Sequence, residues 1–146
     1  MRMKCIIKKL WVVIAILWTA VSAHAYDFEV GGIYYTVLSA TDLTCCADRG
    51  DVKYSGEVVI PSEVVYKGRS LKVTKIERNA FAGCTSLASV TIGDSVTYIE
   101  ENAFEDCTSL TSLTIPDSVT EIDSRVLWMH FAYHPYNRCL SVYFRI

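Results

Sequence analysis

The chain has 146 residues, of which 51% are hydrophobic and 21% are charged, and its formal net charge at pH 7 is −2. This length is enough for one domain. The acidic balance excludes the basic surface with which proteins bind nucleic acid or an anionic membrane.

Residues 1–25 predict a cleaved secretory signal peptide. Four basic residues and no acid precede an apolar run from Leu10 to Ala23, which is shorter than the roughly 20 residues that a membrane-spanning helix needs. Small residues at Ala23 and Ala25 suit signal peptidase, and Cys5 precedes the apolar run, so it cannot be a lipidation site. Cleavage after Ala25 would leave sixteen acids and ten bases, a net charge of −6. We expect a secreted or cell-surface protein with no nucleic-acid partner and no membrane insertion after cleavage.

An exported protein enters an oxidising compartment, in which thiols can pair. Five cysteines follow the predicted signal peptide, and this odd number leaves at least one of them free or intermolecular. They are Cys45, Cys46, Cys84, Cys107 and Cys139.

Residues 26–72 predict an N-terminal hairpin segment, which contains two β-hairpins. Gly31-Gly32 and Lys67-Gly68 each stand between β-prone runs and suit two-residue turns with positive φ. The stretch between the hairpins, "ATDLTCCADRGD", is polar and predicts a surface loop. Its vicinal pair Cys45-Cys46 is interpreted as a loop disulfide partner or spare thiols, in preference to a redox or metal site.

A repeat with a period of 23 residues follows in 73–125. "NAFAGCTSLASVTIGDSVTYI" (79–99) is nearly copied by "NAFEDCTSLTSLTIPDSVTEI" (102–122). Self-similarity at 20 to 29 residues indicates a leucine-rich-repeat solenoid. The matched positions are mostly apolar, as stacked coils require.

Each period predicts one coil of a β-rich α/β solenoid. "LASVTI" and "LTSLTI" favour a strand, "GDS" and "PDS" a turn, and "VTYI" and "VTEI" a second short strand. "NAFAGC" and "NAFEDC" begin with Asn, a good helix cap, and predict a helical turn. The inward positions of one coil are then Val96, Ile99, Ala103, Phe104, Cys107, Leu110, Leu113 and Ile115.

The pattern "NAFxxCTSLxSxTIxDSVTxI" resembles the BspA-type leucine-rich repeat, a family of bacterial cell-surface and secreted solenoids. The resemblance extends from the N-terminal hairpin segment to the repeats, over residues 26–123. Residues 26–72 are expected to cap the open end of the solenoid, because terminal repeats need a cover. The resemblance implies adhesion, with a protein or glycan partner on host matrix or another cell.

Outward strand residues are the candidate ligand contacts. Small hydroxylated side chains on an extended sheet face can bind protein or glycan, although they are also ordinary solvent-facing residues. The candidates are Ser89, Thr91, Ser112 and Thr114, with Thr97 and Thr120 on the adjoining short strand.

The repeated cysteines and acids favour structural interpretations. Cys84 and Cys107 lie one period apart, where a disulfide is conceivable, but parallel stacked side chains favour buried thiols. Glu100-Glu101 and Glu105-Asp106 are interpreted as a solvated acidic edge.

Residues 126–146 depart from the repeat. His130, His134 and Cys139 are nominal metal ligands, but Pro135 interrupts a helix there and no second paired ligand is present. We therefore expect no metal and no cofactor. The tail is interpreted as a divergent C-terminal cap or, equally, as a foreign reading frame of a truncated gene.

The sequence thus favours a non-enzymatic binding module, because it contains no nucleophile motif, phosphate loop or paired-carboxylate site. The alternative is a structural remnant of a longer adhesin with no binding activity of its own, since fewer than three clear repeats are marginal for stability. A thiol-dependent or metal enzyme is the least supported class.

Overall fold

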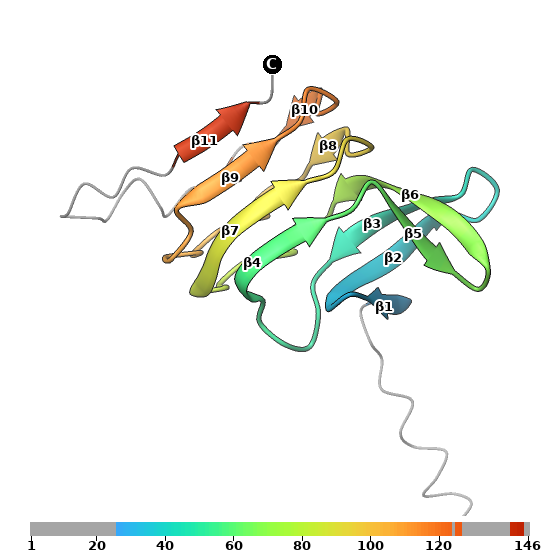
Figure 1. Ribbon diagram of the computed structural model, residues 1–146, viewed down its shortest axis with the longest axis horizontal. Helices are drawn as coiled ribbons and strands as arrows, with labels where there is room; N and C mark the ends of the chain where they lie inside the picture. The colour runs from blue at the N-terminus through green and yellow to red at the C-terminus, as the bar shows by residue number, and fades with distance from the viewer. Residues whose placement is uncertain (1–25, 124, 127–140, 145–146) are drawn as a thin grey trace, which may run out of the picture.

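The computed structural model describes residues 26–123, 125–126 and 141–144, and every regular element in these residues is a β-strand. The strands form two sheets that face one another (Figure 1). The β-rich solenoid predicted from the repeat is therefore confirmed as a β fold, and its α component is wrong for the described residues.

The first sheet has four parallel strands in the order β11-β9-β7-β4. Strands β7 and β9 come from the two copies of the repeat, at the positions where strands were predicted. Strand β4 comes from the N-terminal hairpin segment, so that segment supplies a strand to the same ladder. The bounds are β4 Ser55–Ile60, β7 Ser86–Ile92, β9 Ser112–Ile115 and β11 Ser141–Phe144.

The second sheet has seven strands. Its main order is β1-β2-β3-β6-β8-β10, and β5 pairs with the first half of β6. Strands β1, β2 and β3 of the N-terminal hairpin segment continue this sheet beyond β6, while β8 and β10 are the short strands of the two repeats. The bounds are β1 Phe28–Val30, β2 Ile33–Ser39, β3 Thr44–Asp48, β5 Glu63–Tyr66, β6 Arg69–Ile76, β8 Tyr98–Ile99 and β10 Glu121–Ile122.

The core lies between the two sheets. It contains the positions that repeat, together with buried residues of the N-terminal hairpin segment such as Tyr35 and Ile60. All eight inward positions predicted for one coil are buried, including Phe104 and Leu113. The aromatic rings of Tyr54, Phe81 and Phe104 form a column, with centroids 4.6 Å and 5.2 Å apart. At the last described short strand the burial decreases, because Ile122 is 46% exposed.

Both predicted hairpin turns are confirmed. Gly31 and Gly32 have φ of 61° and 82° and join β1 to β2, whereas Lys67 and Gly68 have φ of 50° and 74° and join β5 to β6. Positive φ at both central residues matches the right-handed twist of the flanking strands.

The predicted helical turn at the start of each repeat is wrong. Asn79 and Asn102 do not cap a helix, because both adopt the left-handed conformation with φ of 58°. Gly83 and Asp106, four residues further on, have φ of 67° and 56° and are also left-handed, so a right-handed helix cannot continue through them. The segments are therefore tight turns, which stack through backbone hydrogen bonds such as Phe81 N to Ala103 O, 2.9 Å.

The predicted surface loop at Cys45-Cys46 is also wrong. Residues 44–48 form β3, which is paired to β2 on one side and β6 on the other. Both cysteines are fully buried. Polar neighbours such as Asp48 suggested a loop, but its carboxylate accepts a hydrogen bond of 2.6 Å from the Thr36 hydroxyl within the sheet.

Two groups of sequence predictions lie outside the described residues. These are the signal peptide at 1–25 and most of the tail, including His130, His134 and Cys139. Of the tail, residues 141–144 are described as β11, which pairs with β9 in parallel. Within the described part of the chain, no helix is both long enough and apolar enough to cross a membrane.

Candidate functional site

The outer face of the parallel sheet brings four of the six candidate contacts together. Ser89 of β7 pairs in register with Ser112 of β9, and Thr91 pairs with Thr114. Adjacent strands lie about 4.8 Å apart, so each pair places two hydroxyl-bearing side chains side by side. The strand alternation predicted this outward orientation, and all four residues reach the surface.

The remaining two candidates lie elsewhere and have a structural contact. Thr97 and Thr120 lie immediately before β8 and β10, on the side of the other sheet. The Thr97 hydroxyl donates to the Thr74 carbonyl at 3.2 Å, and the Thr120 hydroxyl donates to the Thr97 carbonyl at 3.3 Å. These two hydroxyl protons therefore join one coil to the next.

The four hydroxyls on the sheet face have no such contact in the described part of the molecule. Neither the pair Ser89 and Ser112 nor the pair Thr91 and Thr114 forms a side-chain hydrogen bond to another described residue. Hydroxyl groups that face solvent in this way can donate to and accept from a ligand. Among the described residues, this face consequently offers a regular array of hydroxyls that no side-chain hydrogen bond occupies.

Two residues of this face were missed by the sequence analysis. In β4, Glu57 pairs in register with Ser89, and Val59 pairs with Thr91. They extend the two hydroxyl rows by one strand, with an acid in one row and an apolar side chain in the other. The available signal was the likeness of "VVIPS" (58–62) to "VTIGD" (90–94). Ser62 and Asp94 are 32 residues apart, however, because the β5–β6 hairpin lengthens this coil beyond the period.

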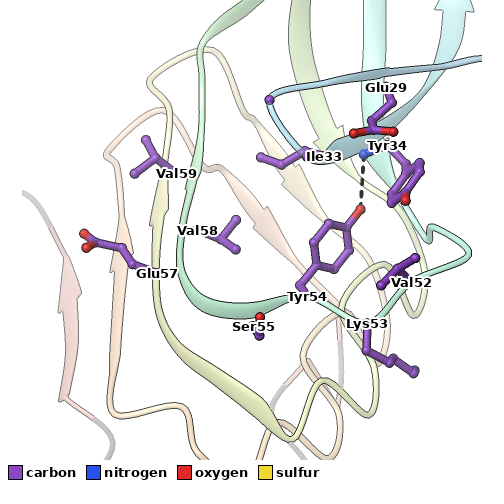
Figure 2. A pocket seen from close by; sticks show the side chains of 12 residues that line it. Glu29, Ile33, Tyr34, Val52, Lys53, Tyr54, Ser55, Glu57, Val58 and Val59 are labelled. Atoms are coloured by element: carbon purple, nitrogen blue, oxygen red, sulfur yellow. Dashed lines mark hydrogen bonds between the residues drawn. The ribbon is translucent and has the colours of Figure 1, made fainter.

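A hollow of about 400 Å³ lies beside β4 (Figure 2). Ile33, at the start of β2, and Val58 point toward one another across it, and Tyr54 lies below them. The Tyr54 hydroxyl accepts a hydrogen bond from the Tyr34 backbone N–H at 3.2 Å and donates one to the Asp48 carbonyl at 2.9 Å. The aromatic wall of the hollow is thus fixed by the N-terminal hairpin segment.

A second hollow, of about 340 Å³, lies between the β2–β3 turn and the β5–β6 hairpin. Val37, Leu43, Tyr66 and Leu71 give it a largely apolar lining. Leu43 adopts φ of 57°, which is uncommon for a bulky residue, and its carbonyl accepts a hydrogen bond of 2.8 Å from Lys72 N.

The predicted solvated acidic edge is wrong for its first pair. Glu100 forms an ion pair of 2.9 Å with Lys75, and Glu101 forms ion pairs with Arg78 and Arg125. The carboxylates are largely shielded, and each one joins its own coil to a neighbouring one. The second pair, Glu105-Asp106, lies in the turn, where Asp106 is exposed.

Lys75 is the centre of this ion-pair cluster. Its ammonium also contacts Glu77 at 2.9 Å. Burial acts to lower the pKa of Lys75, but hydrogen bonds to Glu100 and Glu77 outweigh it and raise that pKa. Burial likewise acts to raise the pKa of Glu77, whereas hydrogen bonding to Glu100 and Lys75 lowers it overall. The cluster therefore stabilises both charged forms.

The four described cysteines are buried and free, which confirms the buried-thiol interpretation for Cys84 and Cys107. The Cys107 thiol donates to the Phe81 carbonyl, with Sγ 3.1 Å from the oxygen. Burial raises the pKa of Cys46 and Cys107 to about 12 and that of Cys45 to about 11. These groups are thiols at neutral pH, and a thiol is a poor nucleophile and a poor metal ligand.

No cluster of three or more histidine, cysteine or acidic residues that could hold a metal ion occurs in the described ranges. The chemistry available on the described surface is thus hydrogen bonding, apolar contact and charge.

Comparison with known families identifies the repeat. A family model described as "BspA type Leucine rich repeat region (6 copies)" matches residues 69–131. Residues 69–131 are a BspA-type leucine-rich repeat region. The resemblance seen in the sequence is confirmed, and the BspA-type segment contains β6, β7, β8, β9 and β10.

Solved bacterial structures resemble the chain over a larger part of its length. A leucine-rich repeat protein from Bacteroides ovatus has 34% identity and a TM-score of 0.59, with 64% of this chain and 24% of that one covered. A leucine rich cell surface protein from Faecalibacterium prausnitzii has 29% identity and a TM-score of 0.56, with 66% and 26% covered. A leucine-rich repeat protein from Bacteroides capillosus has 26% identity and a TM-score of 0.54, with 81% and 97% covered.

The chain spans about a quarter of the length of the first two of these proteins. No curated protein sequence matches it. The BspA-type region and the solved structures therefore establish the family of the repeat and its β-rich fold.

Proposed function

We propose that this chain is an exported, non-enzymatic binding module that attaches to a protein or glycan on host matrix or another cell. Export rests on the predicted signal peptide at 1–25, and the similar protein from Faecalibacterium prausnitzii is described as a cell surface protein. The observation that carries the proposal is the outer face of the parallel sheet. There, register-matched hydroxyls are open to solvent and have no partner among the described residues.

The chemistry of this face suits a polar, extended ligand. Along a parallel strand, outward residues repeat every two positions, or about 6.6 Å, and across strands about every 4.8 Å. A hydroxyl can both donate and accept, so this lattice can match either sugar hydroxyls or exposed peptide groups. Val59 adds an apolar contact at the end of the row that contains Thr91 and Thr114.

The test is binding of the purified chain to immobilised host matrix proteins, to a glycan array and to whole bacterial cells. The informative variant is Thr91→Arg with Thr114→Arg, which inserts two bulky side chains in the middle of the face. We expect a loss of at least about tenfold in affinity, because a central contact is blocked. Val65→Arg, on exposed β5 of the other sheet, is the matched control and should leave binding unchanged.

The double variant Thr97→Arg with Thr120→Arg tests the two remaining predicted contacts. Since their hydroxyls join the coils, we expect a smaller loss of affinity than for the sheet-face pair. Unchanged affinity in the Thr91 and Thr114 variant would contradict the proposed face. A chain that aggregates and binds none of the three ligand sets would favour the alternative of a structural remnant.

A further inference from the structure

Strand β4 is an end strand with one unused edge. It stands last in the order β11-β9-β7-β4, and its one strand partner in the described part of the chain is β7. The backbone N–H and C=O groups on its other edge are therefore free to pair. Such an edge is a template for an added strand, and proteins usually shorten, cover or charge it.

The hollow beside β4 lies along this unused edge. Its lining includes Ser55, Glu57, Val58 and Val59 of β4 and no residue of β7. The β1–β2 turn at Gly31-Gly32 lies on the far side of the hollow. The hollow therefore separates the edge of β4 from this turn, and no described strand packs against the edge there. An extended chain segment can approach the β4 backbone there.

The two sides of β4 differ in chemistry, and this difference specifies the segment. Figure 2 shows Val58 directed into the hollow, whereas Glu57 and Val59 project to the opposite side of the strand. A strand added at this edge alternates its side chains in the same way. Its inward side chains would meet Ile33, Val58 and Tyr54, and its outward side chains would lie beside Glu57.

The charge at the edge is acidic. Glu29 and Glu57 border the hollow, and neither forms an ion pair with another described residue. The cation that lines it, Lys53, extends away from the hollow and donates to the Ala82 carbonyl. Val52 and Val59 add apolar surface, with exposed fractions of 66% and 57%.

We propose that β4 accepts an extended peptide strand in which apolar residues alternate with basic ones. The apolar side chains enter the hollow, the basic side chains pair with Glu57, and the backbone continues the parallel sheet by β-augmentation. This site shares Glu57 and Val59 with the outer face of the sheet. It does not depend on the four hydroxyls of that face, and it stands whether or not they bind a ligand.

The probe is an acetylated and amidated hexapeptide of alternating lysine and valine, titrated calorimetrically into the purified chain. The matched peptide of alternating glutamate and valine has the same β-pattern and the opposite charge. We expect the lysine peptide to bind at least about tenfold more tightly, because it faces Glu57. Equal affinity for the two peptides, or binding of neither, overturns the proposal.

Backbone pairing is tested by N-methylation of the lysine peptide. Alternate residues direct their N–H groups to opposite edges of a strand, so only one of the two edges faces β4. One set of amides, either those of the lysines or those of the valines, faces β4, and its methylation should abolish binding. Methylation of the other set should leave binding unchanged. Loss with both sets or with neither overturns β-augmentation.

The protein variant is Glu57→Lys, with Glu121→Lys on exposed β10 as the charge-matched control. Glu57→Lys should reverse the preference from the lysine to the glutamate peptide, and Glu121→Lys should leave it unchanged. If both variants act alike, the attraction comes from net charge and the proposal fails. It also fails if sedimentation shows that the wild-type chain dimerises and the peptide cannot compete, because a second copy would then occupy the edge.

Discussion

The aromatic column predicts the largest loss of stability from a single truncation. Phe81 is fully buried between Tyr54 and Phe104, with its ring 15° from the plane of the Phe104 ring. Phe81→Ala removes the ring from both neighbours and leaves a cavity. Buried Phe→Ala changes cost about 3–5 kcal/mol, and two aromatic contacts place this one near the upper end.

A loss of that size is a large share of the roughly 5–15 kcal/mol that typically stabilises a domain. For a chain of this length it corresponds to a melting temperature lower by about 12–20 °C. The measurement is urea and thermal unfolding followed by far-UV circular dichroism. Phe81→Leu, which keeps most of the apolar volume, should lose less.

The control is Val65→Ala on β5, where the side chain is 66% exposed. Exposed substitutions usually change stability by less than about 0.5 kcal/mol. If Phe81→Ala unfolds within about 1 kcal/mol of the wild type while Val65→Ala behaves as expected, the column is not part of the cooperative core. The packing argument for the coils would then be refuted.

Three further predictions concern the thiols, the ion pairs and a turn. Cys107 should resist alkylation at pH 8 in the native chain and react promptly in urea, since burial raises its pKa to about 12, and rapid native labelling would contradict its burial. Lys75→Ala should destabilise the chain by about 1 kcal/mol near pH 7. Because the pKa of Glu77 is lowered in the fold, its contribution should be present above its unfolded pKa and lost as pH falls through the folded value, and this acid-side loss should shrink in Lys75→Ala. The contribution of Lys75, whose pKa is raised, should persist below its unfolded pKa and disappear as pH rises through the folded value; pH-dependent melting curves that are parallel for variant and wild type would contradict both. Gly32→Val should cost more than about 1 kcal/mol because φ there is 82°, and an unchanged urea midpoint would contradict the turn geometry.

The repeated core was predictable because identical coils must bury identical positions. Phe104 and Leu113 repeat Phe81 and Val90 after 23 residues, and all four are buried. The hairpin turns were predictable for a local reason, since glycine pairs such as Gly31-Gly32 tolerate positive φ. Both inferences needed only the residues themselves and their spacing.

The errors arose where a distant segment decides the local structure. Residues 44–48 look like a polar loop, but pairing with both β2 and β6 makes them a strand. Asn79 suits a helix cap by composition, whereas the stacked turn of the next coil favours its left-handed conformation. Glu100 appeared solvated because its partner Lys75 lies one coil away.

The sequence predicted which way the side chains of the candidate contacts point, but it did not predict which of their hydroxyls form hydrogen bonds within the protein. Strand alternation placed Thr91 and Thr114 outward, and the structure agrees. The same reasoning could not predict that the Thr97 hydroxyl donates a hydrogen bond to the Thr74 carbonyl, because that bond exists only once two coils stack. Glu57 was missed because its coil is longer than the period that revealed the others.

The hydrogen bonds between coils determine which insertions and deletions the fold can accept. The Thr97–Thr74, Thr111–Ala88 and Thr120–Thr97 contacts each join residues 23 positions apart. Insertion or deletion of a whole 23-residue unit recreates every one of these contacts at the new junction. An insertion or deletion of any other length within a coil shifts the hydrogen-bond donors away from their acceptors. The exception is an insertion that forms a hairpin outside the stacked coils, as the β5–β6 hairpin does. Variation in chain length should thus occur in whole coils or in protruding hairpins, and the gene can lengthen or shorten this surface without redesigning its core.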